Sequence, residues 1–324
     1  MRWRALFCSG MTLAASACTS ILGIDHDYRA APAGSTSGGD GAASATDGAA
    51  FPADPGAVVK VVAGKFHACA LFSSGVAKCW GRNDDYLELG DGSGSSTSVP
   101  MPAMGGGLSD LFAGAHQTCA TIAAGAECAG RGDQGQLGDG SSADSSVPVR
   151  ATAFAAAPVQ VASGEAFLCA LLPDGGVWCV GDGTHGELGD GASHASVVPV
   201  QARLAKAAQA VAAFDVHACA LLVDGTVSCW GDDSFGQLGD GQAASGAGAP
   251  APPGVVVGLA GATAIGVGVE HSCALVGGAT SGAVWCWGGN ESGQLGDGTT
   301  TSRARPVRVQ GATGATLLAV GGFH

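Results

Sequence analysis

A segment of about 50 residues is written five times along this chain, and that repetition limits the folds it can adopt. The clearest mark is Leu-Gly-Asp-Gly, which begins at Leu89, Leu137, Leu188, Leu238 and Leu295. Successive marks are therefore 48, 51, 50 and 57 residues apart. Self-similarity at this spacing predicts a solenoid or a propeller, in which each repeat is one structural unit.

Each unit has the same internal order. An apolar stretch such as VVKVVAG comes first, and a Cys-Ala-Leu strand then leads through a turn to a strand ending in Cys-Trp-Gly. A Gly-Gln-Leu-Gly-Asp-Gly loop follows, and a Val-Pro-Val strand such as SVPVR closes the unit. Four short strands per unit are typical of a β-propeller blade. A parallel β-helix has a much shorter period, and a helical array would need helices.

Helices are poorly supported by the composition. The chain has 56 glycines, and glycine is unfavourable inside helices. The one weak helix candidate is an Ala-rich patch from Leu204 to Ala213. We therefore predict an all-β propeller with five complete four-stranded units and the start of a sixth. The expected units span residues 57–105, 106–156, 157–205, 206–260 and 261–312, with a partial unit at 313–324.

The fourth and fifth units resemble the repeats of the regulator-of-chromosome-condensation family. The segments that carry the resemblance are HACALLVDGTVSCWGDDSFGQLGDG, from His217, and HSCALVGGATSGAVWCWGGNESGQLGDGT, from His271. The family pattern combines Gly-x-x-His, Ala-Leu, Asp-Gly, Trp-Gly and Gly-Gln-Leu-Gly. The resemblance covers residues 57–324 and implies a β-propeller, commonly of seven blades.

Three units depart from this pattern. The second has Ala129-Gly130 and the third has Val180-Gly181 in place of Trp-Gly, and the third has Phe167 at the histidine position. The first unit reads YLELGDG where the others have a Gly before Gln or Glu. We expect these departures to change surface details more than the fold.

The cysteines fall into two groups. Cys8 and Cys18 lie near the N-terminus, and the others of the 12 form one pair in each unit. In the fourth unit a three-residue loop ending at Gly225 would place Cys219 opposite Cys229, at a non-hydrogen-bonded position with Cα atoms about 4.5 Å apart. That distance suits a disulfide, although paired free thiols in the core are the alternative. The predicted pairs are Cys69-Cys79, Cys119-Cys128, Cys169-Cys179, Cys219-Cys229 and Cys273-Cys286.

Other recurring residues are interpreted as architecture. A residue repeated at one position in several blades is more readily structural than catalytic. The expected structural residues are His67, His217, His271, Trp80, Trp230, Trp287, Gly90, Gly138, Gly189, Gly239 and Gly296, with the tryptophans wedged between blades. The Asp that precedes Gly in every unit, such as Asp91, is either an Asx-turn residue, which we favour, or a calcium ligand.

The N-terminal segment has the layout of an export signal. Arg2 and Arg4 precede an apolar run that is too short to span a bilayer, and the segment ends Ala15-Ser16-Ala17-Cys18. This end resembles the lipobox of bacterial lipoproteins, in which the cysteine is lipidated; cleavage after Ala17 to give a secreted protein is the alternative. Residues 1–18 are thus an expected export signal and residues 19–56 an expected flexible tether. The expected location is the outer membrane or the cell surface.

Charge and motifs limit the function. The net charge is −13, so we expect no nucleic-acid partner and membrane contact only through the lipid anchor. No P-loop, His-Glu-x-x-His or Gly-x-Ser-x-Gly motif is present, and we predict no catalytic, cofactor or metal site. The leading hypothesis is a non-catalytic, exported scaffold for an unknown protein partner. The alternatives are a cell-envelope lyase or hydrolase and, less favoured, a guanine-nucleotide exchange factor or a binder similar to β-lactamase inhibitors.

The last residues predict an unfinished unit. LLAVGGFH, which ends at His324, aligns with AIGVGVEH, which ends at His271. We therefore expect a fragment of a longer propeller rather than a smaller closed ring. Size-exclusion chromatography of residues 57–324 distinguishes the two, because an open ring would aggregate through its exposed sheet edges whereas a closed ring would elute as a compact monomer.

The lipobox interpretation predicts that Cys18→Ala abolishes membrane anchoring. The variant should leave the membrane fraction or remain unprocessed, because no thiol is left to lipidate. Fractionation and mass spectrometry of the N-terminus would check this. A variant that fractionates and is processed like the parent would contradict the interpretation.

Overall fold

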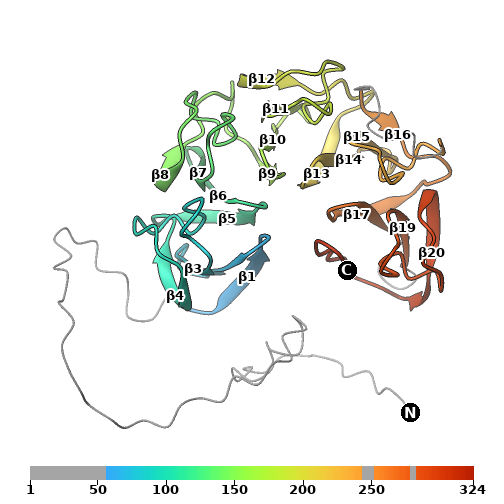
Figure 1. Cartoon of the computed structure of the whole chain (residues 1–324), viewed down its shortest axis with the longest axis horizontal. Helices are drawn as coiled ribbons and strands as arrows, with labels where there is room; N and C mark the ends of the chain where they lie inside the picture. The colour runs from blue at the N-terminus through green and yellow to red at the C-terminus, as the bar shows by residue number, and fades with distance from the viewer. Residues whose placement is uncertain (1–55, 243–251, 278–281) are drawn as a thin grey trace, which may run out of the picture. The chain divides into compact units, whose positions relative to one another are not determined.

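The computed structural model describes residues 56–242, 252–277 and 282–324. Within them, strands β1 to β20 form five antiparallel four-stranded sheets arranged around a ring (Figure 1). The predicted all-β propeller of four-stranded units is therefore confirmed. Among these residues no helix is long and apolar enough to cross a membrane.

Each blade is one sheet whose strands follow chain order from the centre of the ring to its rim (Figure 1). The first blade contains β1 (Val58–Ala63), β2 (His67–Phe72), β3 (Ala77–Gly81) and β4 (Thr97–Ala103). The second contains β5 (Leu108–Ala113), β6 (Gln117–Ile122), β7 (Gly125–Gly130) and β8 (Ser145–Arg150). The third contains β9 (Gln160–Ser163), β10 (Phe167–Leu171), β11 (Val177–Gly181) and β12 (Ser196–Gln201).

The remaining two blades have the same order. The fourth contains β13 (Ala208–Phe214), β14 (His217–Leu222), β15 (Val227–Gly231) and β16 (Gly254–Val255). The fifth contains β17 (Ala262–Val267), β18 (His271–Val276), β19 (Ala283–Gly288) and β20 (Arg303–Thr313). Residues 314–324 lie against the fifth blade, where Leu318 and Val320 pack on its apolar cluster.

The central hairpin of the fourth blade has the register that its sequence predicts. Leu221 pairs with Val227 and Cys219 pairs with Cys229. Gly225 has a φ of 78°, the left-handed conformation that the three-residue loop requires. The amide of Leu222 donates to the carbonyl of Thr226 at 2.9 Å, which closes the loop.

A disulfide joins the two central strands of every blade. The five bonds link the predicted partners, from Cys69-Cys79 to Cys273-Cys286, with Cα atoms 4.1 Å apart in each. All ten cysteines are buried in the apolar clusters. In blades with few aromatic residues, each bond stabilises a hairpin that has little core of its own, on the scale of about 2–4 kcal/mol.

Tryptophans fill the contact between successive blades. Trp230 and Trp287 are fully buried, and each indole Nε1 donates at 2.8 Å to a backbone carbonyl of the preceding blade, that of Glu187 or Gln237. Trp80 lies in the first blade and is partly exposed. The glycine after the Gln-Leu pair explains why these contacts are close, since a Cβ on Gly239 would lie 2.7 Å from Trp287 Nε1.

Two blades that lack the tryptophan fill the space with a residue from elsewhere in the sequence. Ala129 stands at the tryptophan position of the second blade, and Met104 is fully buried beside it. Val180 stands there in the third blade, and Phe154 packs in the same apolar cluster. Large side chains from the connections after β4 and β8 therefore replace the missing indoles.

The weak helix candidate at Leu204 to Ala213 is wrong. Most of it forms β13, the inner strand of the fourth blade, which pairs with β14. Ala208 and Val211 of this strand are buried in the core shared by the third and fourth blades. Packing against neighbouring strands thus overrides the helix propensity of alanine.

The recurring Asp residues close Asx turns. In each blade the carboxylate accepts the amide of the residue two positions on; Asp91 accepts Ser93 at 2.9 Å and Asp297 accepts Thr299 at 2.8 Å. The geometry agrees with the favoured turn interpretation.

Gly239→Ala is expected to destabilise the protein by about 2–4 kcal/mol, because it combines a left-handed backbone strain with a clash against buried Trp287. Gly258→Ala is the matched control: Gly258 also has a positive φ, 81° against 69°, but nothing lies within 4 Å of its Cβ position. The control should cost about 1 kcal/mol. Equal losses in urea unfolding would contradict this account of the glycine.

Candidate functional site

The loops at the centre of the ring bring several blades into direct contact. We call axial loops the segments between the first two strands of each blade and those that run from its Trp-Gly position to the following Gln or Glu before Leu-Gly. Backbone hydrogen bonds link the first kind in sequence: Lys65 N to Ala115 O, Ala115 N to Gly164 O, and Glu165 N to Asp215 O. Side chains from four blades therefore meet on this face.

An ion pair connects blades that are not neighbours. Lys65 Nζ of the first blade lies 3.8 Å from Asp215 Oδ1 of the fourth. Both side chains are partly buried, so this pair is less screened by solvent than a surface pair. It links the first and fourth blades across the loops of the second and third.

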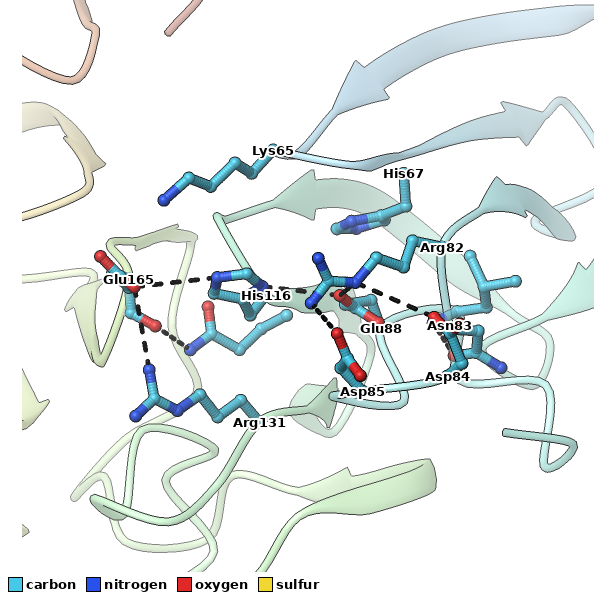
Figure 2. Close-up of polar contacts among 12 residues, drawn as sticks. Lys65, His67, Arg82, Asn83, Asp84, Asp85, Glu88, His116, Arg131 and Glu165 are labelled. Carbon is cyan, nitrogen blue, oxygen red and sulfur yellow. Dashed lines mark hydrogen bonds and ion pairs between the residues drawn. The ribbon is translucent and has the colours of Figure 1, made fainter. Parts of the chain in front are cut away.

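His116 lies at the middle of a polar cluster (Figure 2). Its Nδ1 is 3.5 Å from Glu88 Oε1 and its Nε2 is 3.8 Å from Glu165 Oε1. The Tyr86 ring packs against it at an interplanar angle of 50°, with ring centroids 4.4 Å apart. Arg131 Nη1 also reaches Glu165, at 4.0 Å. A buried histidine therefore bridges carboxylates of the first and third blades.

Glu88 departs from its equivalents in the other blades. The Gln or Glu at this position elsewhere accepts the amide of the residue two before it, as Gln136 accepts Gln134 and Glu187 accepts His185, both at 2.8 Å. The first-blade loop is one residue longer, and Leu87, with a φ of 64°, occupies the position that is glycine in the others. Glu88 is buried and faces His116 instead.

The axial loops of the third, fourth and fifth blades are acidic. Their exposed or partly exposed carboxylates, which we call the acidic axial surface, are Glu165, Asp182, Asp215, Asp232, Asp233, Glu270 and Glu291, whereas Glu187 is buried. These loops contain no Lys or Arg. In the first two blades, basic residues occupy equivalent positions. Lys65 aligns with Glu165 and Asp215, and Arg82 and Arg131 align with Asp182 and Asp232.

The pKa values of three carboxyl groups on these loops are raised, first by burial and then by neighbouring negative charge. Burial raises the pKa of Asp215 to about 6, and the adjacent Glu165 adds to the effect. Burial also raises the pKa of Asp233 to about 6, with Asp240 and Asp232 contributing. The pKa of Glu270 is raised by burial and by Glu291 and Asp232. A cationic group brought to this surface would relieve the repulsion.

A pocket of about 220 Å³ opens among the loops of the second, third and fourth blades. Its wall includes Arg131 on one side and Glu165, Asp182, Glu187 and Asp215 on the other. Across residues 56–242, 252–277 and 282–324, no group of three or more His, Cys, Asp or Glu side chains is arranged to hold a metal ion.

The recurring histidines lie behind this face, between blades. His67 Nε2 is 2.9 Å from Thr118 Oγ1 of the next blade, and that hydroxyl donates to the carbonyl of Glu88 at 2.6 Å. His217 and Ser272 repeat the arrangement at 2.9 Å. Because the hydroxyl hydrogen is used by the carbonyl, Nε2–H is the donor. Burial keeps these rings neutral and lowers their pKa values to about 4 for His67 and about 3 for His217.

The partner hydroxyl is absent where the histidine is absent. The third blade has Phe167 at the histidine position, and the fourth blade has Ala218 in place of Thr or Ser. Both are fully buried and pack in one apolar cluster. His271 is also buried, and its pKa is lowered to about 4.

The sequence analysis missed the group formed by Lys65, Glu165 and Asp215, which we call the axial cluster. That analysis used the residues that recur, whereas Lys65, Glu165 and Asp215 differ in charge at one repeat position. Aligning the units and asking where the charge changes sign would have found them. The proposed lipidation residue, Cys18, lies outside the described residues.

Family models match this chain in several segments. A model described as the regulator of chromosome condensation (RCC1) repeat matches residues 128–171 and 281–324. A second model of the same repeat matches residues 58–86, 159–187 and 210–237. The chain belongs to the regulator of chromosome condensation repeat family. The RCC1 resemblance drawn from the fourth and fifth units is thereby confirmed.

This chain spans only part of the length of each relative that it matches. The human and mouse E3 ubiquitin-protein ligases HERC2 are 31% identical over 277 residues, which is 82% of this chain and 6% of each relative. Prp20p from Saccharomyces cerevisiae matches with a TM-score of 0.67 at 21% identity, over 79% of this chain and 64% of Prp20p. Human WBSCR16 matches with a TM-score of 0.64 at 22% identity, over 78% of this chain and 67% of WBSCR16. These two structures show the fold.

His217→Gln is expected to weaken the acid sensitivity of the RCC1-repeat domain. The pKa of His217 falls from an ordinary 6.5 to about 3 on folding, so the unfolded chain takes up the proton first as pH falls. Above about pH 6.5 the free energy of unfolding is not reduced by His217. As the pH falls toward 3, protonation of the unfolded chain reduces it, by roughly 3 kcal/mol at pH 4. Glutamine, present as Gln117 in the second blade, does not titrate.

Urea unfolding of both proteins between pH 7 and 4 measures the difference. The wild type should lose more stability than His217→Gln over this range. His194→Gln, which replaces a half-exposed histidine, is the control and should follow the wild type. Parallel pH profiles for all three proteins would contradict the buried neutral state of His217.

Proposed function

We propose that this chain is a non-catalytic protein-interaction scaffold that is exported and anchored at the cell surface through Cys18. Its axial face, and the acidic axial surface in particular, binds the partner. The partner is a protein with a basic patch. The arrangement of charge on the axial loops is the observation that carries this proposal.

Charge on these loops is not required by the fold. The same position is Lys65 in the first blade, Glu165 in the third and Asp215 in the fourth, while the backbone hydrogen bonds around it persist. Burial, and to a smaller extent the neighbouring carboxylates, raise the pKa values of Asp215, Asp233 and Glu270, which costs stability in the free protein. Charge gathered in this way is suited to steering and orienting a basic partner.

Relatives with this fold supply further support. Prp20p is described with its binding to Gsp1p and histones, and yeast RCC1 (Prp20) has been solved with Kap60 bound. These partners are proteins. A protein partner for the present chain is consistent with them, and its own net charge of −13 disfavours a nucleic acid.

The alternative, a cell-envelope lyase or hydrolase, would rest on His116. A histidine oriented by a carboxylate is a common general base. Here both ring nitrogens face carboxylates and the side chain is 5% exposed, so the ring offers a substrate little access. His67 and His217 are equally enclosed between blades. The geometry therefore favours binding over catalysis.

Asp182→Asn with Asp232→Asn is expected to weaken partner binding about tenfold at low salt, because two charges leave the acidic axial surface. Each carboxylate also accepts an amide in its own turn, which asparagine can still accept. The partner would be captured from envelope extract with the wild-type chain and then purified. Calorimetry would measure its affinity for each variant.

Asp174→Asn with Asp224→Asn is the matched control. These residues occupy equivalent turns between the two central strands of the same blades, each accepts an amide, and the same two charges are lost. The control should bind like the wild type. Equal affinity for all three proteins would contradict recognition by the axial face, and turnover abolished by His116→Ala would instead support the enzyme.

A further inference from the structure

The outer strand of the fifth blade differs from its equivalents in charge. In β8 the residues on either side of the shared proline include Ser145, Val147 and Arg150, and in β12 they are Ser196, Val198 and Gln201. The same three positions of β20 are Arg303, Arg305 and Arg308. The second blade has one arginine at these positions, Arg150, and the third has none, so the fold does not require all three.

Two of these arginines are not used within the protein. Arg303 pairs with Asp297, with its Nε 3.1 Å from Oδ2. Arg305 and Arg308 are exposed, and neither side chain has a hydrogen bond or ion pair with any residue of the described segments. The guanidinium of Arg305 lies beside Gly241. An acidic protein therefore presents a basic strip on one strand, in which Arg305 and Arg308 have no ion-pair partner among the described residues.

The strand that carries this strip is at the edge of its sheet. β20 pairs only with β19 and lies at the rim of the ring (Figure 1). A shallow hollow of about 340 Å³ continues along its second half, from Arg308 to Thr313. Pro306 removes one backbone donor from the edge, so side chains rather than a continued β-ladder would contact a ligand here.

We propose that β20 is a second interaction surface, one that binds an extended acidic segment of a partner protein. Residues of an extended strand are about 3.3 Å apart, so the arginines form a linear series that matches carboxylates along an extended peptide. Arginine is well suited to paired contacts with carboxylate groups.

A protein segment fits this strip better than other polyanions. Recognition of anionic lipid by basic clusters takes about four to eight Lys or Arg residues, and β20 offers three. Nucleic acid carries dense negative charge, which the remaining surface of a chain with a net charge of −13 would repel. A short acidic segment needs only local compensation. This surface is separate from the axial loops and does not depend on the partner proposed for them.

The test uses the full chain and a fluorescent peptide of alternating Asp and Ser. Binding by fluorescence anisotropy should weaken as salt is raised. Arg305→Val with Arg308→Gln, which introduces the residues of β12, should reduce affinity about tenfold. Arg150→Gln with Arg203→Gln removes two arginines from other blades and should leave affinity within about twofold of the wild type.

The same peptide with Asn in place of Asp should not bind. Equal affinity of the wild type and both double variants for the acidic peptide would overturn the proposal. So would equally tight binding, at matched salt, of a DNA duplex or of vesicles rich in anionic lipid, since either would show a general attraction for anions.

Discussion

In the first, third and fourth blades, the backbone carbonyl of the Gln or Glu that precedes Leu-Gly ties the blade to the next. The carbonyl of Gln237 accepts Trp287 Nε1 at 2.8 Å and Ser272 Oγ at 3.1 Å, and that of Glu88 accepts Thr118 Oγ1 at 2.6 Å. A buried carbonyl without a donor would be costly, and at these three contacts the following blade supplies the donor. The small glycine nearby, the buried tryptophan and the neutral histidine that donates to the same hydroxyl all follow from this contact.

Because this contact occupies the recurring residues, recognition is left to the positions that vary. The disulfides and the carbonyl contacts stabilise the blades. One position in the axial loops meanwhile changes from basic Lys65 in the first blade to acidic Glu165 and Asp215 in the third and fourth. The loop of the first blade is one residue longer, and Glu88 contacts His116 instead of accepting an amide in its own turn as its equivalents do. Repeats thus provide a constant frame on which individual blades differ.

Much of the frame was predictable from sequence, because period, hairpin spacing and cysteine pairing are local properties. The register of Cys219 with Cys229 follows from the position of Gly225 alone. Met104 and Phe154, which replace missing tryptophans, were not predictable because they come from connections outside the motif. The axial cluster was missed for a related reason: Lys65 and Asp215 are 150 residues apart, and only the ring brings them together.

Hydrogen–deuterium exchange of the chain, free and bound to its purified partner, tests the central claim that the axial loops carry recognition. Exchange in the free protein should be slow in the disulfide-linked central strands and faster in the loops. The account predicts that the partner slows exchange in segments 182–187 and 232–237, next to Asp215. Protection confined to the outer strands, with these loops unchanged, would contradict it.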